Sequence, residues 1–146
     1  MRRDERGQVT VLIVGFALLI GMLIAVVVDA SAAYVQRQGL NSIADGAALH
    51  GADQGATGEE VYTGGVTDER LELTRAKAKE AVRSYLVDVG AYRRYPGLAF
   101  NVTVDSTSQR ITVNLNAPLD LPLTFPGSPE SAMVGATGSA VVDPDD

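Results

Sequence analysis

The stretch that decides the fold is VTVLIVGFALLIGMLIAVVV, residues 9–28, which lies near the N-terminus and contains no charged residue. A helix of about 20 apolar residues, rising ~1.5 Å per residue, spans the ~30 Å hydrocarbon core of a bilayer. Its Val, Leu, Ile and Phe side chains favour insertion by about 4–8 kcal/mol in total. We therefore predict a membrane-spanning segment at 9–28, whose lipid-facing anchor residues include Val9, Leu12, Phe16, Leu19, Leu23 and Val27.

The charges on either side of this run predict its orientation. Arg2, Arg3 and Arg6 precede it, and Asp29 ends it. Because basic residues stay on the cytoplasmic side, residues 1–8 are expected in the cytoplasm and the rest of the chain outside. Beyond Val28 the chain carries nine Lys and Arg against sixteen Asp and Glu. An acidic domain repels phosphate backbones, so nucleic acid is not an expected partner.

The alternative for the apolar run is a cleaved secretory signal. Ala30-Ser31-Ala32 has the small residues of a cleavage site. Signal sequences, however, have apolar regions of roughly 7–15 residues, which is shorter than this run. Residues 29–54 also continue the helical pattern, since they are rich in alanine and contain no proline. The retained anchor is the favoured interpretation.

One helix is expected from Gln8 to Asp53, about half of it outside the bilayer. Gly39, Gly46 and Gly51 each cost about 1 kcal/mol in a helix interior. Two explanations stay open: another backbone packs closely against the helix at these glycines, or the helix frays or bends near Gly39.

Residues 55–142 are expected to form an extracytoplasmic α+β domain. A glycine-rich loop, Gly55 to Val66, precedes a second helix that Thr67 would cap and that would run to about Val89, with Gly90 as its C-cap. Three- and four-residue spacing makes this helix amphipathic. Its apolar face comprises Leu71, Ala78, Val82, Tyr85, Leu86 and Val89.

After Pro96 the apolar period changes to two, which indicates strands. Segments 100–105 and 111–116 predict a β-hairpin with a four-residue loop, Ser106 to Gln109. Residues 117–129 hold four prolines, which argue against a regular central strand. A last strand, Met133 to Val142, has small side chains that would let a helix approach closely, and residues 143–146 form an acidic tail. The predicted class is α+β, with a long N-terminal helix, an amphipathic second helix and a small antiparallel sheet.

The residue inventory argues against an enzyme. The chain has no cysteine and one histidine, His50, and it contains no phosphate-binding glycine loop, nucleophile elbow or metal quartet. The aspartates of the tail match no calcium-loop spacing. We therefore expect no catalytic residue, cofactor, metal or small-molecule substrate.

Some residues suggest contacts instead of chemistry. Asp29 is either a polar stop at the membrane boundary or a partner for a basic group on a neighbouring helix. Segment 92–95, Tyr-Arg-Arg-Tyr, is either a solvated turn or a contact for lipid headgroups or an acidic partner. An alternating apolar strip is either a partner surface, if exposed, or an irregular edge packed on the core, which is favoured. The strip consists of Leu119, Leu121, Leu123 and Phe125.

The N-terminal third resembles TadE/TadG-like pilus-assembly proteins. The resemblance rests on RGQVT at 6–10, the apolar run, Val28-Asp29, Tyr34 and, most specifically, LNSIADGAAL at 40–49. It implies a membrane-anchored component of a tight-adherence (Flp-type) pilus, either a minor pilin or pseudopilin or an assembly factor. Its partners would be the lipid bilayer and other pilus or assembly-platform subunits, contacted through the N-terminal helix. It would be a single-pass protein of the bacterial cytoplasmic membrane, able to be extracted into a surface appendage.

Within this resemblance, Asn41 and Asp45 lie four residues apart and so share one face of the helix. They either form hydrogen bonds to a helix of another subunit or, as is slightly favoured, bond within the subunit or to water. The expected helix–helix assembly contacts are Asp29, Tyr34, Gly39, Asn41, Asp45 and Gly46. The order of a long helix and a small antiparallel sheet also resembles pilins in general. The chain departs from type IV pilins in one respect. These are usually cut after a glycine and carry a glutamate at the fifth position of the mature chain, whereas a cut after Gly7 would place Leu12 there. The alternative function is a membrane-tethered binding module that enters no filament.

Overall fold

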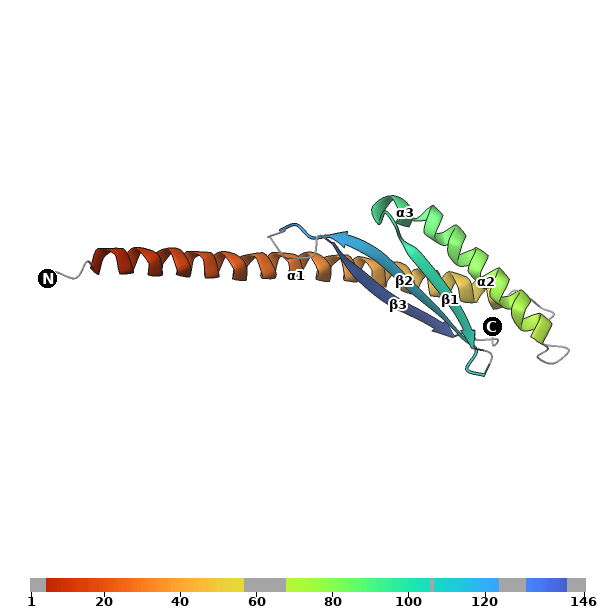
Figure 1. Cartoon of the computed structure of the whole chain (residues 1–146). Coiled ribbons are helices and arrows are strands. Elements are labelled where there is room, and N and C mark those ends of the chain that lie inside the picture. The colour runs from red at the N-terminus through yellow and green to blue at the C-terminus, as the bar shows by residue number, and fades with distance from the viewer. Residues whose placement is uncertain (1–4, 57–67, 106, 124–130, 142–146) are drawn as a thin grey trace.

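The computed structural model describes residues 5–56, 68–105, 107–123 and 131–141. Its elements, in chain order, are α1 (Glu5–Ala56), α2 (Asp68–Asp88), α3 (Ala91–Arg94), β1 (Ala99–Asp105), β2 (Arg110–Asp120) and β3 (Ser131–Val141). The first half of α1 projects alone as a rod, and its second half lies against the head formed by the other elements (Figure 1). The predicted α+β class is confirmed.

The long helix is continuous. α1 has 52 residues, which at ~1.5 Å each gives about 78 Å. It begins three residues before the predicted start at Gln8 and ends three residues after Asp53, so Gly55 and Ala56 belong to the helix and not to the expected loop. The rest of that loop, residues 57–66, and the expected cap Thr67 lie outside the described residues. The helix also continues through Gly39 without a break.

The sheet is a three-stranded antiparallel meander in the order β1-β2-β3. Asp105 pairs with Arg110, which confirms the hairpin with a four-residue connection. Ile111 in turn pairs with Ala140 of β3. β3 starts two residues before the predicted Met133 and ends at Val141. Val142 and the tail 143–146 lie outside the described residues.

The strand that was expected at 111–116 runs further, into the proline-containing segment, but there it is not paired on both sides. β2 is the central strand, and it continues through Pro118 to Asp120, with Pro118 opposite Met133 of β3. Its pairing with β1, however, stops at Asn116. From there β2 has a neighbour on one side only, and an edge of this kind tolerates a residue that lacks an N–H.

One face of the sheet packs on both helices, while the other is polar. The shared core is made mostly of small and branched apolar side chains. Its main members are Leu40, Ala44, Ala47 and Ala48 of α1, Ala78, Val82 and Leu86 of α2, Ile111, Val113 and Leu115 of β2, and Val134, Ala136 and Ala140 of β3. On the other face, Thr137 Oγ1 donates a hydrogen bond of 2.8 Å to Asn114 Oδ1. The head is therefore a single layer of sheet on a layer of two helices.

The end of α2 agrees in part with the prediction. Ala78, Val82 and Leu86 are buried as expected, but Val89 is 46% exposed and follows the last helical residue, Asp88. Val89 was placed wrongly because the helix ends one residue earlier than the apolar spacing suggests. Gly90 has φ of +68°, and its N–H donates to the Val87 carbonyl at 3.0 Å. This left-handed position confirms the predicted glycine cap.

Candidate membrane anchor and assembly surface

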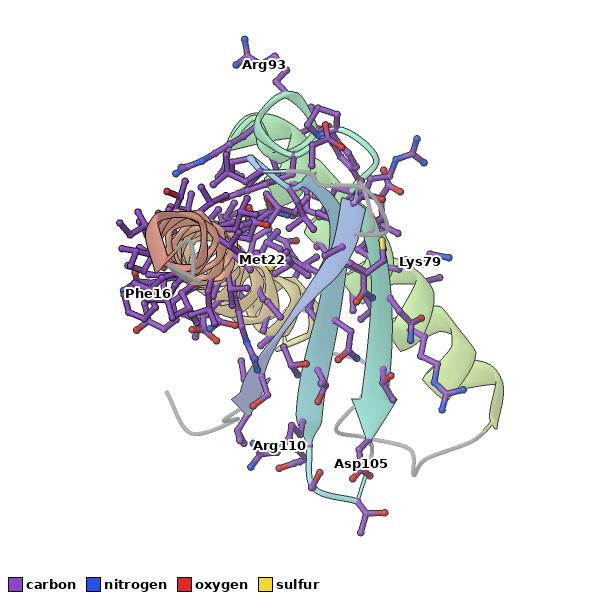
Figure 2. The ribbon with its side chains drawn as sticks, turned by 60° about the vertical axis from the view of Figure 1, so that its left-hand side comes forward. Phe16, Met22, Lys79, Arg93, Asp105 and Arg110 are labelled. Carbon is purple, nitrogen blue, oxygen red and sulfur yellow. The ribbon has the colours of Figure 1, made fainter. Side chains whose placement is uncertain are left out.

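Residues 9–28 of α1 are apolar on every side. Their large side chains are between 38% and 73% exposed, and none of them packs on the head. Phe16 and Met22, for example, lie on opposite sides of the rod (Figure 2), and both are more than half exposed. Within the described residues, one helix is long and apolar enough to cross a membrane, and this is that helix. A helix that is apolar all round needs lipid or other helices around it.

The second half of α1 has two different faces. Leu40, Ala44 and Ala48 are fully buried against the chain's own sheet. A Cβ added to Gly138 of β3 would collide with backbone atoms of Ala44 and Asp45. The small residues of the LNSIADGAAL segment therefore serve contact within the chain, as the small-residue pattern of β3 predicted.

The expected assembly residues divide between these faces. Tyr34, Asn41 and Asp45 have exposed side chains. Gly39 and Gly46 are instead partly buried, and each lies under a tyrosine hydroxyl, of Tyr95 and Tyr85 respectively. Close packing at these glycines thus involves side chains of the same chain. The role of all these residues in contacts between subunits stays a prediction.

Asp29 has a partner within the chain. Its Oδ1 accepts a hydrogen bond of 3.1 Å from the backbone N–H of Leu123, 94 positions later. Seven residues further along α1, Gln36 Nε2 donates to the Pro118 carbonyl at 3.1 Å. No sequence pattern pointed to Gln36, since a lone glutamine on a helix is ordinary. Together the two bonds fix the end of β2 along α1.

The predicted apolar strip is only partly covered. Leu119 packs against the core, Leu121 is half-buried and Leu123 is 40% exposed. Phe125 lies outside the described residues. Of these three leucines, Leu123, which lies next to Asp29, is therefore the most exposed.

Segment 92–95 forms most of α3 and the residue after it, not a fully solvated turn. Tyr95 is only 7% exposed, and the Arg94 guanidinium lies 5.6 Å from the centre of its ring. Arg93 points outward at the tip of the head (Figure 2). A shallow groove beside Arg94 is lined by Ser31, Ala32, Val35 and Gln36 of α1.

The described residues offer little for catalysis. His50 lies beside Tyr85, with ring centres 5.7 Å apart. Among the residues that the structure describes, no group of three or more acidic or histidine side chains could hold a metal ion. A second shallow groove, between α2, α3 and β1, is lined by Lys79, Glu80, Arg83, Val87, Tyr92 and Phe100 among others. The candidate functional regions are therefore the exposed rod and the region where it meets the head.

The sequence of α1, which forms the rod and its junction with the head, matches a known family model. Residues 7–54 match the model of the putative Flp pilus-assembly TadE/G-like family. This TadE/G-like segment is one third of the chain and comprises nearly all of α1, from the exposed apolar run to the alanines under the sheet. This segment is accordingly similar to the corresponding part of Tad pilus-assembly proteins. No curated protein and no solved structure matches it.

Proposed function

We propose that the protein is a membrane-anchored structural or assembly component of a Tad/Flp-type pilus, in the manner of a minor pilin or pseudopilin. The observation that carries the proposal is the TadE/G-like helix itself, whose first half is exposed and apolar and whose second half carries a folded head. An apolar rod of this kind is stable either in lipid or packed among other such rods. It can therefore hold the subunit in the bilayer and later join it to an assembly.

The exposed face of α1 outside the bilayer supports contacts with other subunits. Tyr34, Val35 and Leu49 are each more than 60% exposed there, on the helix that also carries Asn41 and Asp45. Apolar and hydrogen-bonding side chains along one helix suit a helix from another subunit. We infer that neighbouring copies or pilus subunits pack on this side, while the opposite side holds the head.

Shearing and fractionation of cells test the proposal. Protein that is released with sheared filaments supports a subunit role, and protein that stays in membranes with an intact Met1 supports an assembly-platform role. N-terminal sequencing of the native protein adds the processing state: a start near Gln8 indicates pilin-like maturation, and a start near Ala33 a secreted domain. A freely soluble native protein would contradict both roles.

The second candidate is a membrane-tethered binding module outside any filament. The partly exposed Leu121 and Leu123 favour it, because exposed leucines suit a partner. This candidate predicts that deletion of the other pilus genes leaves the protein's level and location unchanged. A pilus component would instead lose abundance or change location in that background.

A further inference from the structure

The end of β2 runs along α1 back toward the membrane anchor. We call residues 119–123 the strap. At its start the Pro118 carbonyl accepts a hydrogen bond from Gln36, and at its end the Leu123 N–H donates to Asp29. Figure 1 shows this segment, the blue continuation of β2, passing close to α1 on the side of the projecting rod.

The two hydrogen bonds set the position of the strap along the helix axis. Gln36 lies seven residues beyond Asp29, which is about 10 Å along an α-helix. Asp29 directly follows Val28, the last residue of the apolar run. The backbone of Leu123 is therefore held within a few ångströms of the level at which the apolar run ends.

The leucine of the strap that lies nearest this level is the most exposed of its three leucines. Leu119 is packed on the core, Leu121 is half-buried, and Leu123 is 40% exposed. A segment adapted to water would turn its leucines inward as its distance from the core grows. An exposed leucine at the level of the anchor's end, next to the half-buried Leu121, indicates that this end of the head meets an apolar or interfacial medium.

Asp29 supports the same conclusion. A carboxylate at the end of an apolar run is costly to hold near lipid unless it is paired or hydrated. Here it accepts a backbone N–H, so one bond satisfies both the carboxylate and a main-chain donor of the strap. The bond also fixes the depth of Leu123 relative to the rod.

We propose that the strap is a second membrane contact, with Leu121 and Leu123 seated in the interfacial layer of the bilayer. The proposal rests on the membrane anchoring of α1 in the proposed function. The polar layer is about 5–7 Å thick on each side of the hydrocarbon core, which includes the level of Asp29. The occupant of the leucine surface is therefore lipid. The head is held against the bilayer and cannot swing freely on the rod.

Depth-dependent fluorescence quenching tests this proposal. The chain has no cysteine, so single cysteines at Leu123, Ser108 and Leu19 can each carry one fluorophore. The full chain is reconstituted into phosphatidylcholine–phosphatidylglycerol vesicles that contain spin-labelled lipid. We expect several-fold stronger quenching at 123 than at 108 in the exposed hairpin loop, with shallow spin labels more effective than deep ones. The label at 19 should show the opposite depth preference.

The outcomes separate this proposal from the anchor on which it rests. If the label at position 123 is quenched no more than the label at position 108, while the label at position 19 is quenched by deep spin labels, the strap contact is overturned and the anchor stands. Absence of quenching at 19 contradicts the anchor itself. Protection of 123 in native membranes, but not in vesicles of lipid alone, identifies a protein partner and likewise overturns the proposal.

A second variant tests the role of the hydrogen bond. With the fluorophore at position 121, Asp29→Ala should release the strap and lower lipid quenching, whereas Asp88→Ala removes an exposed carboxylate at the end of α2 and should not. Circular dichroism of both variants checks that the head remains folded. Unchanged quenching in folded Asp29→Ala shows that the bond does not set the depth of the strap, and contradicts that part of the proposal.

Discussion

At the scale of single residues, Gly138 marks the closest approach of sheet and helix. The atoms that an added Cβ would meet there are the carbonyl group of Ala44 and the backbone nitrogen of Asp45. Backbone atoms within a continuous helix cannot move aside as a flexible side chain can. Contact between β3 and α1 thus depends on the absence of a side chain at this one position.

We expect Gly138→Ala to lower the free energy of unfolding of the head by about 1–3 kcal/mol, the usual cost of overpacking. Urea denaturation in mild detergent, followed by circular dichroism, measures the loss. Gly135→Ala is the matched control in the same strand, because its Cβ would meet mainly the Asn116 side chain, at 2.9 Å on the exposed face. Equal losses in both variants would show that the contact with α1 is not the cause.

At Gly39 an added Cβ would meet a side chain instead of backbone atoms. A Cβ there would displace the Tyr95 ring, which is 7% exposed. Loss of that burial costs about 1.5–3 kcal/mol, against about 1 kcal/mol gained in helix propensity, so Gly39→Ala should destabilise the head by roughly 0.5–2 kcal/mol. The same denaturation measures it. Gly15→Ala, which meets no heavy atom within 4 Å, should leave the transition unchanged; a more stable Gly39→Ala would contradict this account.

Asp105 begins the hairpin loop, and its hydrogen bonds lower its pKa. The Ser108 hydroxyl donates to the carboxylate at 2.7 Å and the Thr107 N–H at 2.9 Å, and both favour the charged form. A depressed pKa means that this contribution to the loop is present above the unfolded pKa and is lost as the pH falls through the folded pKa. An NMR titration should give a pKa below the usual aspartate value, and Ser108→Ala should raise it. An unshifted pKa in the native chain would contradict the loop geometry.

At the scale of elements, α1 is one helix in two environments. Its first half is exposed and apolar on all sides, while its second half buries one face of small residues under β3 and β2. Since helix hydrogen bonds are internal, the backbone passes between these environments without a change in conformation. The first half can thus be altered without disturbing the head.

We expect Val14→Arg to abolish stable membrane retention, because a central arginine costs about 2.5–3.5 kcal/mol and removes a favourable side chain. Carbonate extraction of membranes measures retention. Val14→Leu, at the same exposed position, is the control and should stay in the membrane. Normal retention of folded Val14→Arg would contradict a membrane-spanning role for this segment.

At the scale of the whole molecule, the rod and head imply a defined orientation. Arg2, Arg3 and Arg6 favour a cytoplasmic N-terminus. A cysteine at Ser108 should therefore react with an impermeant thiol reagent added to spheroplasts, and a cysteine at Arg3 should react only after lysis. Labelling of position 3 from outside would reverse the topology.

The sequence alone determined the elements with strong periodicity: the long helix, α2, the hairpin and the small-residue strand. Local pattern suffices there, because each element presents one apolar face, or an entirely apolar surface, at its own period. The TadE/G-like segment was also readable directly from its residues. The arginines before the apolar run predicted an orientation that awaits its test.

Tertiary structure decided what each face contacts. The sequence could not show that Asp29 bonds to Leu123, that Tyr85 and Tyr95 cover the glycines of α1, or that β2 continues through Pro118. These contacts join residues far apart in the chain, and the tolerance for proline depends on where the neighbouring strand β1 ends. Such pairings depend on how the elements pack together, a property that no local pattern encodes.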